Sequence, residues 1–213
     1  MPRYLLVLLV TVLATVACGG SSAPSGPTAS SVAAQPSDMP KGVMQCDLTG
    51  DVDHFISSEK PHDPEAAQAI SDEWQQAKKA GATAAFTALY TDSAAHCDAL
   101  KANGADPAAA TYKLVINFVV QYKDEKSAAA AYSGQEPIFT FNPNEFRTGG
   151  DGVVEGSKTG LSEKSITLTQ PVGNQLFYIA MWQNKQFVVI LVVLNVDASA
   201  ARNVAVRENA RIK

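Results

Sequence analysis

The residues that could carry chemistry in this chain are few and widely spaced. The 213-residue sequence contains three cysteines and three histidines, and side chains of these two kinds often act as nucleophiles, bases or zinc ligands. His54, His62 and His96 show neither the H-x-x-x-H nor the H-E-x-x-H spacing of a zinc site on a helix. His96 directly precedes Cys97, so an imidazole–thiolate pair is conceivable there, but a disulfide bond at Cys97 would remove it.

Carboxylates also gather in one short segment. Residues 47–54 hold three aspartates and His54, a composition that could suit calcium. The spacing of an EF-hand loop is absent, and no glutamate follows at the required offset. We therefore interpret this segment as a solvated turn, and the sequence predicts no metal site.

Two short motifs resemble those of known enzymes, but neither has the context that its chemistry needs. Residues 57–60 read S-x-x-K and residues 158–160 read K-T-G, as in penicillin-binding enzymes. However, residues 71–73 are Ser-Asp-Glu rather than S-D-N, and the folded part is too short for such a domain. Residues 152–159 look like a phosphate loop but lack the glycine before lysine. With no G-x-S-x-G motif either, we expect no catalytic residues and no enzymatic activity.

Aromatic residues concentrate in a predicted loop over residues 135–151. Two prolines and two glycines interrupt this segment, and a loop of this length is uncommon in a compact domain. Such a loop either folds down onto the core or lines a ligand site, and the sequence leaves both alternatives open. The candidate ligand-contacting residues are Phe139, Phe141 and Phe146.

The elements before this loop are expected to be helical. Residues 43–60 are expected to be irregular, and Asp63 followed by Pro64 is typical of a helix start. The apolar spacing predicts helices over residues 63–102, with a break at Gly81 and a second helix capped by Thr83.

The remaining elements are expected to be mostly strands. Residues 111–123 alternate apolar and other side chains, which is typical of a strand, and Asp124 can cap a short helix over 125–132. Further strands are predicted over 152–158, 164–170, 175–183 and 186–196, and the last is apolar on both faces and should be central. Asp197 can cap a closing helix. The predicted fold is α+β: an N-terminal helical segment, then an antiparallel sheet of about five strands with a C-terminal helix packed on it.

The N-terminus has the pattern of an export signal. Arg3 is followed by an apolar or small stretch, residues 4–17, that is too short for a stable membrane-spanning helix. It ends in Thr-Val-Ala-Cys at residues 15–18, which resembles the lipobox of bacterial lipoproteins, although leucine is more usual where Thr15 stands. The resemblance implies removal of residues 1–17 and diacylation of Cys18. The alternative is an ordinary cleaved signal.

The same resemblance implies a domain layout and a disulfide bond. Residues 18–40 would be the lipidated cysteine and a flexible tether of Ser, Ala, Pro and Gly, followed by a single extracytoplasmic domain over 41–213. With Cys18 acylated, Cys46 and Cys97 remain, and an oxidising compartment favours a bond between them. The alternative is two unpaired buried thiols.

Composition and compartment limit the functional classes. The net charge of −4 without a basic block argues against nucleic-acid binding and predicts weak repulsion from anionic lipid headgroups. The layout loosely resembles small extracytoplasmic lipoprotein and sensor domains of high-GC Gram-positive bacteria. We therefore expect a lipid-anchored protein on the outer side of the cell membrane that binds or senses a small apolar ligand without a cofactor. The alternatives are an assembly partner for another envelope protein and, third, an exported hydrolase.

Overall fold

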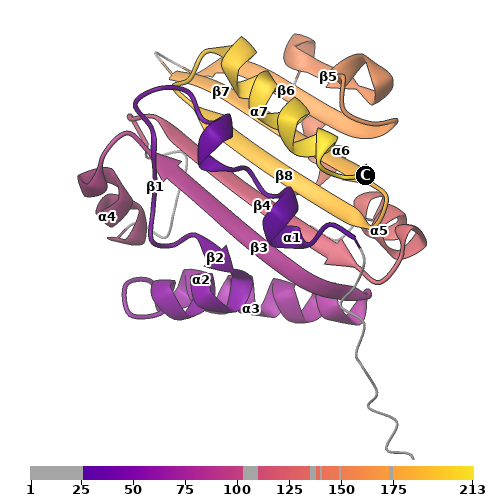
Figure 1. Cartoon of the computed structure of the whole chain (residues 1–213), viewed down its shortest axis with the longest axis horizontal. Coiled ribbons are helices and arrows are strands. Elements are labelled where there is room, and N and C mark those ends of the chain that lie inside the picture. Colours follow the sequence, from indigo (N-terminus) through magenta and orange to yellow (C-terminus); the bar gives the residue numbers. More distant parts are fainter. Residues whose placement is uncertain (1–25, 103–109, 135–137, 140, 149, 173–174) are drawn as a thin grey trace, which may run out of the picture.

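An antiparallel β-sheet of eight strands runs through the centre of the protein (Figure 1). The structure is a computed structural model that describes residues 26–102, 110–134, 138–139, 141–148, 150–172 and 175–213. The expected signal peptide, residues 1–17, and Cys18 lie outside these described residues. The fold is therefore α+β, as the sequence predicts, with more strands than the five expected.

The strand order is β1-β3-β4-β8-β7-β6-β5, and β2 also pairs with β3. Every neighbouring pair is antiparallel, and all eight residues of β8 are buried in the middle of the sheet, as its apolar sequence predicts. The strands are β1 (Met44–Gln45), β2 (Gly50–Asp51), β3 (Ala82–Thr91), β4 (Leu114–Tyr122), β5 (Val153–Glu155), β6 (Lys164–Val172), β7 (Gln175–Asn184) and β8 (Phe187–Leu194).

Three of the longer helices begin at an aspartate, as expected. The carboxylates of Asp63, Asp124 and Asp197 each accept hydrogen bonds from backbone N–H groups in the first turn that follows. The α-helices are α1 (Ala29–Val32), α2 (Val52–Glu59), α3 (Pro64–Lys79), α4 (Ala94–Ala102), α5 (Glu125–Tyr132), α6 (Pro143–Phe146) and α7 (Ala198–Ala210), and short 3-10 turns are η1 (Pro36–Asp38), η3 (Gly150–Gly152) and η4 (Gly156–Thr159).

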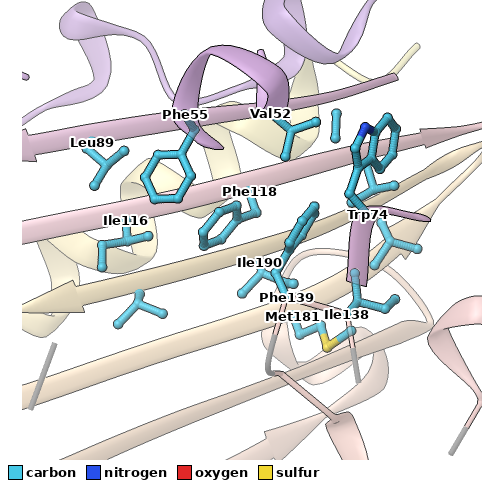
Figure 2. Packing of buried hydrophobic residues seen from close by; sticks show 14 of the residues in the cluster. Val52, Phe55, Trp74, Leu89, Ile116, Phe118, Ile138, Phe139, Met181 and Ile190 are labelled. Atoms are coloured by element: carbon cyan, nitrogen blue, oxygen red, sulfur yellow. The ribbon is translucent and has the colours of Figure 1, made fainter. Parts of the chain in front are cut away.

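Each face of the sheet carries its own apolar cluster, because successive side chains of a strand point to opposite faces. On the first face, Ile116, Phe118 and Ile190 pack against α2, α3, α4 and α5 (Figure 2). On the second face, Val119 and Leu191 pack against α1 and α7, which cross in front of the sheet in Figure 1. Helices therefore cover the central strands on both sides.

The segment expected to form a second helix after Gly81 is instead strand β3. Residues 82–91 pair with β4 along almost their whole length. Leu89 belongs to the first cluster, whereas Phe86 and Tyr90 contact the second, so these residues do not share one face as a helix would require. Pairing with an apolar central strand has overridden the helical preference of an alanine-rich segment. Residues 43–60, expected to be irregular, form β1, β2 and α2.

The end of the expected tether is part of the folded domain. Residues 28–39, which we call the N-terminal strap, lie across the second face of the sheet. The side chains of Ala29, Val32, Ala33 and Ala34 are buried there. The guanidinium of Arg211 donates to the carbonyls of Val32 and Ala33. From Thr28 to Ile212 the chain thus supplies both clusters and the sheet between them, a self-contained folding unit.

Candidate functional site

A pocket of about 360 Å³ opens between helices α3 and α5 on the first face of the sheet. Its volume falls in the range typical of small-molecule sites. Most of the lining is apolar or small. The lining residues are Glu73, Gln76, Ala77, Ala80, Tyr122, Ser127, Ala130, Ala131, Gly134, Ile138 and Phe139.

Small side chains on both helices keep the pocket open. Helix α3 contacts β3, whereas α5 contacts β4, β7 and β8, so the two helices rest on different parts of the sheet. Ala77 and Ala80 line the pocket from the α3 side, and Ala130 and Ala131 line it from α5. A methyl group at each of these positions is too short to fill the space between the helices. The alanine run of α5 therefore borders a cavity.

Phe139 closes the inner end of the pocket. Its ring stacks on Phe118 of β4, with 4.9 Å between ring centroids, and only 2% of the residue is exposed (Figure 2). The backbone of Phe139 has φ 47°, a left-handed conformation that aromatic residues rarely adopt. This turn directs the ring down onto the sheet, beside Ile138.

The other two aromatic candidates lie elsewhere. Phe141 and Phe146 are half-buried and contact each other, with their ring centroids 6.2 Å apart. They pack against the edge of the first cluster and do not line the pocket. Among the described residues of the predicted loop, Ile138 and Phe139 line the pocket, whereas Phe141 and Phe146 pack on the core. The loop thus combines the two alternatives that the sequence left open.

Tyr122 gives the pocket a polar group at its floor. Burial raises the pKa of its phenol to about 12, so the hydroxyl keeps its proton at neutral pH. Within the described part of the chain, no hydrogen bond to this hydroxyl is seen, and the residue is 2% exposed. A ligand that enters the pocket would therefore meet the neutral phenol of Tyr122, while Glu73, Gln76 and Ser127 supply further polar groups to the lining.

Cys46, Cys97, His54 and His96 have structural roles. A disulfide bond joins Cys46 to Cys97 and connects the start of the domain to α4, so no thiolate is left for a pair with His96. The Nδ1 atom of His96 lies 2.5 Å from Asp92, and its ring stacks on Tyr112. The Nε2 atom of His54 lies 2.8 Å from the carbonyl oxygen of Asp47. The acidic segment is not only the expected turn, because from Gly50 onward it forms β2 and the start of α2.

Besides Asp38, which pairs with Arg211, the described residues hold buried carboxyl groups at Glu59 and Glu208, on opposite faces of the sheet and outside the pocket. Glu59, at the end of α2, is 1% exposed, and neither carboxyl oxygen has a hydrogen-bond partner among the described residues. Burial is the main cause that raises its pKa to about 7. Burial also raises the pKa of Glu208 well above its usual range. Within the described ranges no cluster of three or more His, Cys, Asp or Glu side chains is placed to hold a metal ion.

Sequence reasoning missed α3 and α5 as the walls of the pocket. A partial signal was present, because alanines occur in both segments, at 77 and 80 and at 130 and 131. In the described residues, no helix combines the length and apolar character needed to cross a membrane. Comparisons with protein-family models, curated proteins and solved structures gave no match.

Proposed function

We propose that this protein is an exported, lipid-anchored binding module that holds a small, mainly apolar molecule between α3 and α5. The observation that carries the proposal is the pocket itself: about 360 Å³, lined mostly by apolar and small side chains, with one buried hydroxyl. Sites of this kind bind by burial of apolar ligand surface, and a few fixed polar groups set the orientation of the ligand.

The chemistry of the lining favours an amphiphilic ligand. The phenol of Tyr122 offers a hydrogen bond in a pocket whose lining is mostly methyl groups and an aromatic ring, with Glu73, Gln76 and Ser127 as its other polar side chains. A hydroxyl, carbonyl or carboxyl group of the ligand could accept that bond, while its apolar part lies against Ala77, Ala131 and Phe139. A wholly apolar ligand would leave the Tyr122 hydroxyl without a partner, which costs free energy.

The proposed anchor agrees with the beginning of the fold. Cys18 lies ten positions before Thr28, the residue that caps α1 and starts the strap. Two acyl chains on Cys18 would hold a protein at a membrane stably, whereas one chain would not. The module would then act close to the membrane surface.

Binding is tested with residues 26–213, which contain the whole folding unit, expressed in an oxidising compartment. A native mass that exceeds the denatured mass by a defined increment would identify a co-purified ligand. Titration with N-phenyl-1-naphthylamine, a neutral apolar dye, then measures the pocket directly through its fluorescence.

Matched variants connect dye binding to the pocket. Ala130→Phe places a ring into the lining from an exposed helix position and should weaken dye binding at least tenfold. Ala69→Phe makes the same change at an exposed position of α3 outside the pocket and should bind as the unchanged protein does. If neither a mass increment nor dye binding is found, or if both variants behave alike, the proposal is wrong, and a protein partner in the envelope becomes the better hypothesis.

A further inference from the structure

Exposed lysines gather at one end of the sheet, although the chain as a whole is acidic. Six of the twelve lysines in the sequence lie there. We call this part of the molecule the basic end, and its residues are Lys78, Lys79, Lys123, Lys126, Lys164 and Lys185. A net charge of −4 does not reveal this distribution, because lysines distant in sequence meet only in the fold.

The topology explains why these lysines meet. Helix α3 ends where β3 begins, β4 ends where α5 begins, and β7 turns into β8 at the same end of the sheet. Two backbone hydrogen bonds connect these segments: Lys123 N–H donates to the Gly81 carbonyl at 2.9 Å, and Tyr122 N–H donates to the Gln186 carbonyl at 2.8 Å. In Figure 1 this is the end of the sheet beside α5.

Among the described residues, the exposed acids at the basic end are fewer than the lysines. They are Asp124, Glu125 and Glu163, and the carboxylate of Asp124 is engaged as the cap of α5. At the opposite end, the exposed carboxylates of Asp92 and Asp197 follow β3 and β8. Lys113, just before β4, lies beside Asp92 at that opposite end. Lysines are thus concentrated at one end of the sheet, and the other end carries acids with fewer lysines.

The separation of the two ends decides which charge a surface would experience. Strand β4 has nine residues, which corresponds to about 30 Å at roughly 3.4 Å per residue. The Debye length at physiological salt is about 8 Å. An anionic surface in contact with the basic end is therefore screened from the acids at the far end, so the weak repulsion expected from net charge does not apply to this orientation.

The pocket and the start of the strap lie at the same end. Three residues of the pocket lining, Ala80, Tyr122 and Ser127, are sequence neighbours of Lys79, Lys123 and Lys126 respectively. The strap begins beside the end of β4, because the backbone N–H of Ala29 donates to the side-chain oxygen of Gln121 at 3.2 Å. Ten residue steps from Cys18 to Thr28 span at most about 35 Å when fully extended.

We propose that the basic end docks on an anionic phospholipid surface and so holds the pocket at the level of the lipid headgroups. This inference rests on the proposed function of the pocket, and it names the source of the ligand: an amphiphile that exchanges with the bilayer. Each lysine near an anionic membrane strengthens binding about fivefold, so several together give an orientation that a flexible anchor alone would not impose.

The test is co-sedimentation of residues 26–213, which lack Cys18, with lipid vesicles. Binding should be strong to equal mixtures of phosphatidylglycerol and phosphatidylcholine, weak to phosphatidylcholine alone, and lost as salt is raised. The variant K79Q/K123Q/K126Q should reduce partitioning onto the mixed vesicles at least tenfold. The control K41Q/K60Q/K113Q has the same net charge but changes lysines elsewhere, and its partitioning should change less than twofold.

The outcomes separate this inference from the proposed function. Equal loss in the two triple variants, or no preference for phosphatidylglycerol, would overturn docking through the basic end. Retained binding of N-phenyl-1-naphthylamine by K79Q/K123Q/K126Q would show that the pocket is intact in the variant that fails to dock.

Vesicle binding without any dye binding would keep the docking surface and reject the pocket as a ligand site, and with it the proposed exchange. Preference for an acidic polypeptide such as polyglutamate over the mixed vesicles would point to a protein partner and overturn the membrane assignment.

Discussion

Asn117 on β4 donates a hydrogen bond to a carboxyl oxygen of Glu208 on α7, with 2.9 Å between Nδ2 and Oε1, and both residues are completely buried. The same amide nitrogen donates to the carbonyl of Ile190, and the amide oxygen accepts from the backbone N–H of Ala34. One side chain therefore connects the strap, a central strand and the C-terminal helix. Because burial favours the neutral form of Glu208, this network is a set of largely uncharged hydrogen bonds.

Replacing Asn117 by alanine should destabilise the second face. The backbone N–H of Ala34 would lose its acceptor and Glu208 would lose its donor. Each buried polar group left without a partner costs about 1–3 kcal/mol, so we expect the free energy of unfolding to fall by about 3 kcal/mol.

Urea denaturation of residues 26–213 measures this change. A loss below about 1 kcal/mol would mean that the network contributes little. Gln75→Ala, at an exposed position of α3, is the matched control and should leave the free energy of unfolding nearly unchanged.

Removing the strap should destabilise the domain strongly. A chain that begins at Met39 loses the buried side chains of Val32 and Ala33, and it also leaves the hydroxyl of Tyr90 without the carbonyl of Ala34, to which it donates at 2.7 Å. Lost burial and unpaired polar groups together should cost about 4 kcal/mol. Thermal unfolding of chains that begin at Gly26, Thr28 and Met39 checks this. We expect the first two to melt alike, and equal melting of all three would show that the strap is not part of the stable fold.

The sequence was informative where one physical signal dominates. Alternation over residues 111–123 predicted β4, the apolar run before Leu194 predicted a central strand, and an aspartate before Pro64, Glu125 and Ala198 predicted the starts of three helices. In each case the local pattern and the tertiary environment favour the same structure, which is the condition under which sequence reasoning succeeds.

The prediction was wrong where partners distant in sequence decide the structure. Residues 82–91 are rich in alanine, and only their pairing with β4 makes them a strand. The strap has the composition of a linker, yet its small side chains fit against Val115 and Val119 on the second face. The pocket depends on the spacing of α3 and α5. Their alanines hint at small walls, but no local pattern encodes that spacing, so from the sequence only Phe139 was nominated among the lining residues.

The disulfide bond should account for a large share of stability. It joins residues 51 positions apart, and the chain-entropy model gives roughly 4 kcal/mol for a loop of this length. The double variant Cys46→Ser and Cys97→Ser is the suitable comparison, because it leaves no lone thiol next to the hydroxyl of Thr91. We expect its urea midpoint to fall to that of the reduced parent protein. Labelling of both cysteines by a thiol probe in denatured, unreduced parent protein would contradict the bond.

Glu59 should make stability depend on pH. Burial, with a smaller contribution from the carboxylate of Asp63, raises the pKa of Glu59 to about 7, and the charge of Lys101 opposes this shift. Because the folded-state pKa lies above the unfolded value near 4.5, the stability from this group is complete below about pH 4.5 and is lost as the pH rises through about 7. The loss is on the order of 3 kcal/mol, because one pKa unit corresponds to about 1.4 kcal/mol.

The variant Glu59→Gln isolates this contribution. Glutamine has nearly the same shape and cannot ionise, so its advantage over the parent protein should be small at pH 5 and should grow until about pH 8. Thermal unfolding across this range, with Glu125→Gln as an exposed control on α5, measures the difference. Parallel curves for the parent protein and Glu59→Gln would mean that Glu59 is ionised in the folded state throughout. In that case a cation or a donor from outside the described residues must lie against its two carboxyl oxygens, since an unpaired buried carboxylate would be too costly to keep.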